Sequence, residues 1–198
     1  SIYRQVCGVR SFDNISYTYD ENGIRTSKTV DGITTKYYLI QRGDKMGIVF
    51  KTTFDNSKID STAFYDLAEH SFTSEPFFGD YSILIDKSYV SLDVLSDDGF
   101  VCGISGYSPE ENWISRKLNF PKALNGRLNV IFDGYIQEGI AITHNRNWST
   151  FFDLHSKVIC IGNPIIAYNA ETVEFCTNVV AVLADNELVS IWIKPKFI

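Results

Sequence analysis

The chain has few histidines and methionines. It contains three histidines and a single methionine, Met46, among 198 residues. No run of about 18 apolar residues occurs, so the sequence predicts no membrane-spanning helix. The N-terminus lacks the basic-then-apolar pattern of a signal peptide, although Ser1 is not an initiator methionine and an upstream signal therefore stays open.

Cysteine is also sparse, and its spacing excludes the common metal motifs. No CxxC or Cys/His pattern occurs, so we expect neither a metal site nor a cofactor. Three of the cysteines stand in apolar runs, where a small thiol packs as a hydrophobe. We expect reduced core residues and hence a cytoplasmic protein, in preference to a disulfide-bonded secreted one. The four positions are Cys7, Cys102, Cys160 and Cys176.

Positive charge is scarce after the first 45 residues. Residues 1–45 hold seven Lys/Arg and five Asp/Glu, a net of +2, whereas residues 46–198 hold eleven and nineteen, a net of −8. An acidic body repels a phosphate backbone, so the composition argues against nucleic-acid binding. It suits a basic protein partner, or simply solubility.

Strand patterns dominate the chain and predict a mainly β protein, an antiparallel sandwich or meandering barrel with at most one or two short helices. Asp-Gly and Asp-Asn corners between the strands carry hairpin chemistry, at residues 31–32, 98–99, 133–134 and 185–186. The predicted strands are Ile15–Tyr19, Ile24–Val30, Ile33–Ile40, Gly47–Phe54, Tyr81–Ile85, Tyr89–Leu95, Phe100–Ser105, Arg127–Phe132, Ile136–Thr143, Lys157–Ile161, Val179–Leu183 and Glu187–Ile193. A helix is predicted over Ser61–His70 and a single helical turn over Pro109–Trp113.

The stretch Tyr17–Leu39 resembles one YD repeat of the bacterial Rhs family. The resemblance is carried by Tyr19, Asp20, Gly23, Arg25, Gly32, Tyr37 and Tyr38. Rhs proteins are long shells of many such repeats, followed by a Pro- and Gly-rich terminating segment and a variable C-terminal toxin. Here one repeat is present and no proline precedes Pro76, so the terminating segment is missing. The resemblance therefore implies a place in an Rhs-type locus rather than a toxin cut from its shell.

A boundary is predicted at the polar stretch Gln41–Lys45, just before Met46. It divides a YD-repeat-like β-meander, residues 1–45, from an acidic β-rich domain, residues 46–198. The Arg-Gly-Asp-Lys sequence before Met46 can be encoded by a purine-rich ribosome-binding sequence, so Met46 is also a candidate start of a separate gene. The coding DNA decides between that hypothesis and an ordinary internal methionine.

In Rhs-type loci the gene after the toxin usually encodes its immunity protein, and an acidic, motif-poor β-domain fits that role. We therefore expect a non-enzymatic protein that binds and blocks a cognate toxin through acidic and aromatic side chains. Its oligomeric state is open. The expected partner-binding residues are Glu75, Phe77, Phe78, Asp80, Glu110, Glu111 and Trp113.

Two alternatives from other classes stay open. A toxin effector enzyme of hydrolase type would use the polar cluster His144, Arg146, Asp153 and His155 as base, anion clamp and orienting carboxylate. A packed polar loop explains the same cluster. A cell-surface carbohydrate-binding β-module would use exposed loop aromatics, but it requires export.

Overall fold

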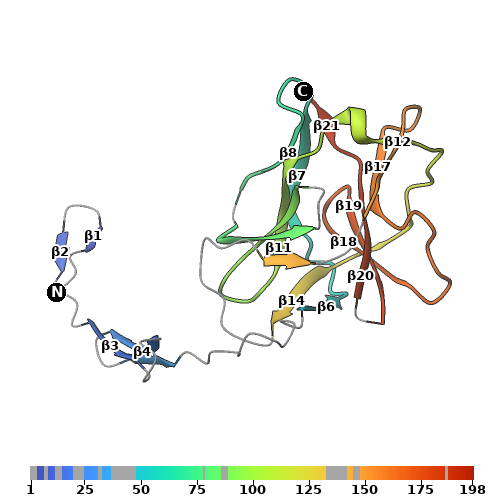
Figure 1. Cartoon of the computed structure of the whole chain (residues 1–198). Helices are drawn as coiled ribbons and strands as arrows, with labels where there is room; N and C mark the ends of the chain where they lie inside the picture. Colours follow the sequence, from blue (N-terminus) through green and yellow to red (C-terminus); the bar gives the residue numbers. More distant parts are fainter. Residues whose placement is uncertain are drawn as a thin grey trace. The chain divides into compact units, whose positions relative to one another are not determined.

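The computed structural model describes the main part of the chain in full and the remaining strands by their backbone. Residues 48–77, 79–85, 89–132, 148–185 and 187–198 are described with their side chains. Strands at residues 4–6, 9–11, 15–19, 25–30, 33–36 and 142–144 are described by backbone alone. The chain divides into two compact units: an N-terminal unit of residues 1–47 and 132–136, and a main unit of residues 48–131 and 137–198 (Figure 1).

The N-terminal unit holds two small antiparallel sheets. One pairs β1 (Arg4–Val6) with β2 (Val9–Ser11). The other is a three-stranded meander of β3 (Ile15–Tyr19), β4 (Arg25–Val30) and β5 (Ile33–Lys36). Val30 pairs with Ile33, so residues 31 and 32 connect the two strands, as the Asp-Gly pattern predicts. These two residues lie outside the described ones, as does the predicted boundary at Met46.

The main unit is a strongly curled sheet that forms a half-barrel, which confirms the mainly β prediction. The strand order is β12-β16-β17-β20-β19-β18-β7-β8-β11-β10-β9-β15, with β13 beside β18 and β21 beside β7. A separate ribbon pairs β6 (Ile48–Thr53) with β14 (Arg127–Phe132). The other strands are β7 (Ile59–Asp66), β8 (Ser71–Glu75), β9 (Tyr81–Ile85), β10 (Val90–Val94), β11 (Val101–Tyr107), β12 (Ile114–Ser115), β13 (Leu124–Asn125), β15 (Ile142–His144), β16 (Thr150–Asp153), β17 (Val158–Gly162), β18 (Glu171–Thr177), β19 (Val179–Ala184), β20 (Glu187–Ile193) and β21 (Lys196–Phe197).

The core explains why some strands alternate and others are apolar throughout. In β9 every second residue is buried, which is typical of a strand with one covered face. All five residues of β17 are buried, because its second face is covered as well. There Val158 and Cys160 pack with Trp192 and with Leu118, from the segment that follows β12.

Residues 61–70 are not a helix, and this prediction is wrong. Ser61, Ala63 and Tyr65 are buried while the residues between them are partly exposed, the period-two pattern of a strand. Apolar residues at this spacing suit β7, which pairs with β8 on one side and β18 on the other. The Asp66 carboxylate then accepts backbone N–H groups two and three residues later and starts a turn.

Other local predictions are confirmed. The segment after Pro109 forms a short 3-10 helix, η2 (Glu110–Asn112). The last hairpin turns at Asp185, whose φ of 53° is the left-handed conformation that Asp tolerates. Gly99 likewise has φ 71° in the loop between β10 and β11. The turn at residues 133–134 lies outside the described part of the chain.

The three cysteines that the structure describes are buried free thiols, as predicted, whereas Cys7 lies outside the described residues. Burial raises the pKa of both the Cys102 and the Cys160 thiol to about 12. Within the described part of the chain, no helix has the length and apolar character needed to cross a membrane.

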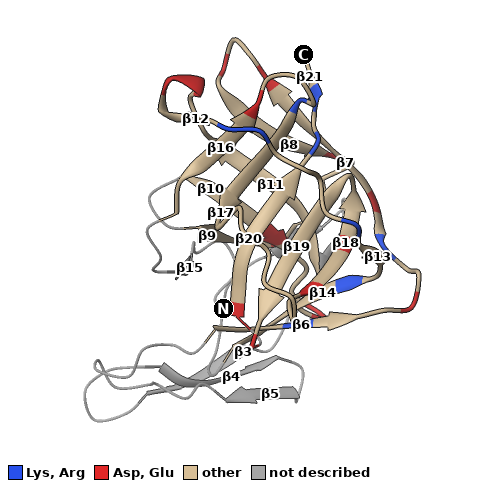
Figure 2. Cartoon of the chain, turned by 90° about the vertical axis from the view of Figure 1, so that its right-hand side faces the viewer, with Lys and Arg blue, Asp and Glu red and all other residues tan. Residues whose placement is uncertain are grey.

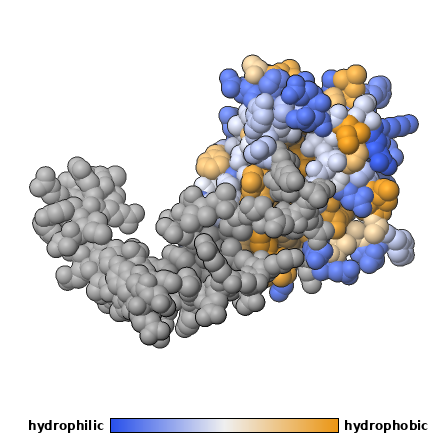
Figure 3. Space-filling view, in the orientation of Figure 1, coloured by the Kyte–Doolittle hydropathy of each residue, from blue (hydrophilic) through white to orange (hydrophobic). Residues whose placement is uncertain are grey.

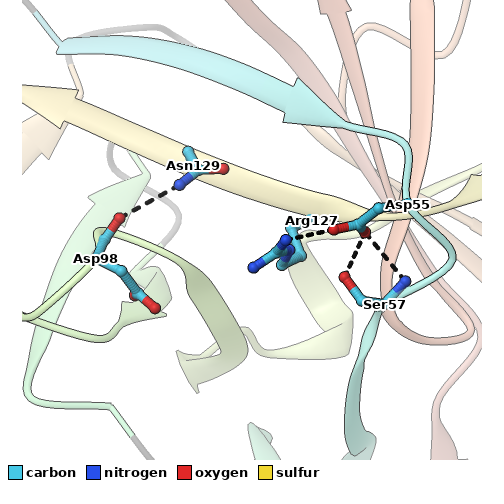
Figure 4. A network of polar contacts seen from close by, with 5 residues as sticks. All are labelled: Asp55, Ser57, Asp98, Arg127 and Asn129. Atoms are coloured by element: carbon cyan, nitrogen blue, oxygen red, sulfur yellow. Dashed lines mark hydrogen bonds and ion pairs between the residues drawn. The ribbon is translucent and has the colours of Figure 1, made fainter.

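An ion pair ties the β6–β14 ribbon to the turn that follows β6. The Arg127 guanidinium pairs with the Asp55 carboxylate, which also accepts the hydroxyl and backbone N–H of Ser57 (Figure 4). These bonds lower the pKa of Asp55 to about 2, with the Ser57 hydroxyl as the largest cause. The guanidinium carbon also lies 4.4 Å from the centre of the Phe100 ring, so Arg127 serves the fold.

Candidate functional site

The expected partner-binding residues fall into two groups at opposite ends of β8. Glu75 is the last residue of β8, and Phe77 and Asp80 follow it. Glu110, Glu111 and Trp113 instead follow β11, whose last residue, Tyr107, pairs with the first residue of β8. Four residues of strand separate these ends by about 13 Å. The six of these residues that the structure describes therefore form two separate groups.

The group after β8 contains one exposed aromatic side chain and one carboxylate that already accepts hydrogen bonds within the chain. Phe77 exposes 61% of its surface, while Phe78 lies outside the described residues. The Asp80 carboxylate accepts the backbone N–H and the hydroxyl of Ser96, at 2.7 and 2.9 Å. The backbone bond is the larger cause that lowers the pKa of Asp80. Asp80 is thus occupied in holding the loop between β10 and β11.

The group after β11 is anchored by hydrogen bonds around Ser108. The Trp113 indole N–H donates to the Ser108 hydroxyl at 3.0 Å, and the Tyr65 hydroxyl donates to the Ser108 carbonyl at 2.8 Å. The backbone N–H of Ser108 donates to the His70 carbonyl at 2.7 Å. Burial, with the negative charge of Glu110 as a smaller cause, raises the pKa of Tyr65 above its ordinary value. Trp113 is therefore held in a fixed orientation.

Aromatic rings around Trp113 form the walls of a cavity. The Trp113 ring centre lies 4.9 Å from that of Tyr65 and 5.1 Å from that of Phe152. The Phe152 and Phe197 centres are 6.1 Å apart, within the range of favourable ring contacts. The cavity measures about 380 Å³, which lies within the usual size range of ligand pockets. We call it the aromatic cavity; it is lined by Leu67, Glu110, Trp113, Ser115, Phe152, Leu154, Lys157 and Phe197.

One acidic and one basic side chain face the aromatic cavity. The Lys157 ammonium lies 5.8 Å from the Phe152 ring centre and 5.7 Å from that of Phe197, near the outer limit of a cation–π contact. The ion pairs among the described residues are Lys58–Glu174 and Arg127–Asp55, so Lys157 and Glu110 are not paired with each other. Both charges are available to a ligand.

Exposed apolar side chains surround this end of the main unit, where the C-terminus lies in Figure 1. Leu67 and Leu154 expose 49% and 69% of their surfaces, and Ile198 exposes 63%. The Leu67 N–H donates to the Ile198 carbonyl at 3.0 Å, and Leu67 and Leu154 line the same cavity, so the three residues lie at one end of the unit. Figure 3 shows hydrophobic residues interspersed with hydrophilic ones over the visible surface of this end. We call Leu67, Leu154 and Ile198 the apolar rim.

The proposed catalytic cluster is described only in part. His144 ends β15, which pairs with β9, but its side chain and all of Arg146 lie outside the described residues. The Asp153 carboxylate accepts the backbone N–H groups of Leu118, His155 and Ser156. The bond from Leu118 is the largest cause that lowers the pKa of Asp153 to about 2. Because so acidic a carboxylate is a weak base at neutral pH, its visible role is to hold two loops together.

His155 itself is exposed, in the turn between β16 and β17. Among the described residues there is no group of three or more His, Cys, Asp or Glu that could hold a metal ion. A catalytic role for His144, Arg146, Asp153 and His155 stays a prediction.

In comparison with known proteins, the chain matches no family model and no curated protein. The Rhs resemblance thus rests on the residues between Tyr17 and Leu39 alone, within the N-terminal unit. Any function of the main unit has to be inferred from its own surface.

Proposed function

We propose that the main unit is a non-enzymatic, immunity-like binding domain from an Rhs-type toxin locus, which blocks a cognate toxin. The binding surface is the end of the half-barrel that carries η2, the aromatic cavity and the apolar rim. The observation that carries the proposal is a cavity of about 380 Å³ with aromatic walls and two exposed leucines, Leu67 and Leu154, in its lining. Rigid aromatic anchors in such pockets dominate the binding energy of many interfaces.

The charge of the surface supports a basic partner. Two acidic side chains, Glu110 and Glu111, stand on η2 beside the cavity, and both are exposed. The excess of acidic residues in the chain after Lys45 adds long-range attraction for a basic protein. Electrostatic complementarity of this kind mainly speeds association, while the apolar anchors slow dissociation.

The experiment is binding of the purified protein to the toxin encoded beside it, measured by biolayer interferometry. Leu154→Asp should weaken binding about tenfold or more, because it places a charge on the apolar rim. The matched control is Ile165→Asp, since Ile165 is exposed to a similar extent, 66% against 69% for Leu154, but does not line the aromatic cavity. The proposal fails if the wild-type protein shows no affinity for that toxin, or if both variants bind like wild type.

A further inference from the structure

A second open cavity adjoins the aromatic cavity and shares Ser115 and Leu154 with it. It measures about 430 Å³, and its other lining residues are Arg116, Lys117, Asp153 and His155. We call it the basic cavity. Figure 2 shows the basic stretch that follows β12 in blue and the acidic η2 turn in red, on either side of this short strand. Aromatic walls and clustered cations thus lie next to each other.

The cations here are unusual for so acidic a chain. Arg116, Lys117 and Lys157 take part in neither of the ion pairs found among the described residues. Arg116 lines the basic cavity, and its guanidinium also lies 5.6 Å from the centre of the Phe151 ring. The one carboxylate in the basic cavity, that of Asp153, is already bonded to three backbone N–H groups. Its negative charge therefore has donors of its own and does not pair with these cations.

We propose that the two cavities together bind a ligand that carries an aromatic ring and an anionic group, such as a phosphate or a carboxylate. The ring enters the aromatic cavity and packs against Trp113 and Phe152, where ring–ring contacts add to the burial of apolar surface. The anionic group lies over Ser115 and Leu154, toward Arg116 and Lys117. Charge-assisted hydrogen bonds from these side chains then hold it.

Lys157 lines the aromatic cavity, two residues after His155, which lines the basic one. Lys157 is exposed and its ammonium lies near the Phe152 and Phe197 rings, so we expect its long side chain to turn toward the anionic group of a bound ligand. Glu110, on the far side of the aromatic cavity, repels a ligand bound in the reverse orientation. The inference goes beyond the proposed function, since it needs no protein partner and concerns a small chemical group.

The test is isothermal titration calorimetry, in which phenyl phosphate is titrated into the full chain. Benzyl alcohol supplies the ring without the charge, and inorganic phosphate supplies the charge without the ring. We expect phenyl phosphate to bind at least about tenfold more tightly than either. Lys117→Gln and Lys157→Gln should each weaken the binding of phenyl phosphate about twofold to fivefold, as expected for one exposed charge contact. Lys122→Gln, an exposed lysine that lines neither cavity, is the matched control and should change nothing.

Two results would overturn the inference: phenyl phosphate binding no tighter than inorganic phosphate, or the Lys117 and Lys157 variants binding like the Lys122 control. Adenosine monophosphate distinguishes the sources of the same chemistry. Tighter binding than phenyl phosphate identifies a free nucleotide as the ligand, whereas weaker binding identifies a smaller aryl anion. Because the probes are small molecules, these outcomes are independent of whether the toxin binds.

Discussion

The carboxylate of Asp93 is buried, and only one of its two oxygens accepts hydrogen bonds from the residues that the structure describes. It lies in β10 and exposes 1% of its surface. One oxygen, Oδ1, accepts the hydroxyls of Ser82 and Ser105 at 2.9 and 2.8 Å. The other, Oδ2, is buried and has no hydrogen-bond partner among the described residues. Gly79 packs directly on Asp93, so close that an added Cβ would lie 2.8 Å from the Asp93 Cβ. Burial raises the pKa of Asp93, and the two hydroxyls offset this only in part.

We expect Asp93→Asn to stabilise the protein at neutral pH. Because the pKa of Asp93 is higher in the folded than in the unfolded state, the folded state favours the neutral carboxylic acid. The stability that Asp93 contributes is therefore fully present below its ordinary pKa of 3.8 and falls as the pH rises through the raised folded value. A buried polar atom without a partner costs about 1–3 kcal/mol, and more when it is charged. Asparagine has the same shape and leaves a neutral amide nitrogen in that place, so the gain comes from removal of the buried charge. A gain of about 2 kcal/mol would raise Tm by about 4–8 °C in a chain of this size.

The measurement is urea unfolding of wild type and Asp93→Asn at several pH values between 4 and 8. The difference in unfolding free energy between them should be smallest at pH 4 and grow with pH, because all other titrating groups cancel. Asp80→Asn is the control with the opposite sign, since hydrogen bonds from Ser96 lower the pKa of Asp80. That variant should lose stability between pH 4 and 8 and converge on wild type only as the pH falls below 3.8, so its series is extended to lower pH. Parallel curves for wild type and Asp93→Asn would refute the reasoning.

Three further outcomes follow from other contacts. Asp153→Asn should destabilise the protein at pH 7 more than His155→Gln does in thermal unfolding. The Asp153 contribution is present above pH 3.8 and is lost as the pH falls toward its folded pKa of about 2, so the two variants should converge in acid. Gly106→Ala should cost at least about 2 kcal/mol in urea unfolding, because Gly106 has φ 116° and an added Cβ would lie 2.1 Å from the Tyr89 carbonyl oxygen; Ser91→Ala in the neighbouring strand is the control, and an equal cost for both would contradict the strain argument. Iodoacetamide should label the three buried thiols, Cys102, Cys160 and Cys176, far more slowly in the native protein than in urea. Peptide mass spectrometry measures the labelling, and labelling of the native protein at the unfolded rate would contradict their burial.

Strands whose burial alternates were predictable from the sequence, and the mixed segments were not. Tyr81–Ile85 was predicted with its observed bounds, because its apolar residues alternate with partly exposed ones and turn residues flank it. Residues 61–70 were misread because alanine, leucine and glutamate favour a helix, whereas pairing with β8 and β18 decides for a strand. The strands β8 and β18 were not predicted, since their polar residues hide the buried positions.

Residues of the candidate site were predictable from the sequence only where charged and aromatic residues stand together in a loop. Glu110 and Trp113 stand out as charged and aromatic residues in a turn, and both line the aromatic cavity. Leu67, Leu154 and Phe197 line it as well, but each is an ordinary apolar residue in its own segment. Parallel pairing of β21 with β7, and of β12 with β16, brings these distant segments to one end of the half-barrel. No local pattern encodes such pairing.

Evidence for the locus and evidence for the binding surface come from different parts of the chain. The Rhs resemblance lies in the N-terminal unit, whereas the aromatic cavity, the apolar rim and the basic cavity belong to the main unit. If a cognate toxin binds, and Leu154→Asp abolishes that binding, the evidence for the locus and the evidence for the binding surface agree. If the toxin does not bind but phenyl phosphate does, the Rhs-type locus inferred from the repeat does not indicate the function, and the main unit is a small-molecule-binding domain. The chemistry of the η2 end thus has to be tested first with probes that assume nothing about the neighbouring gene.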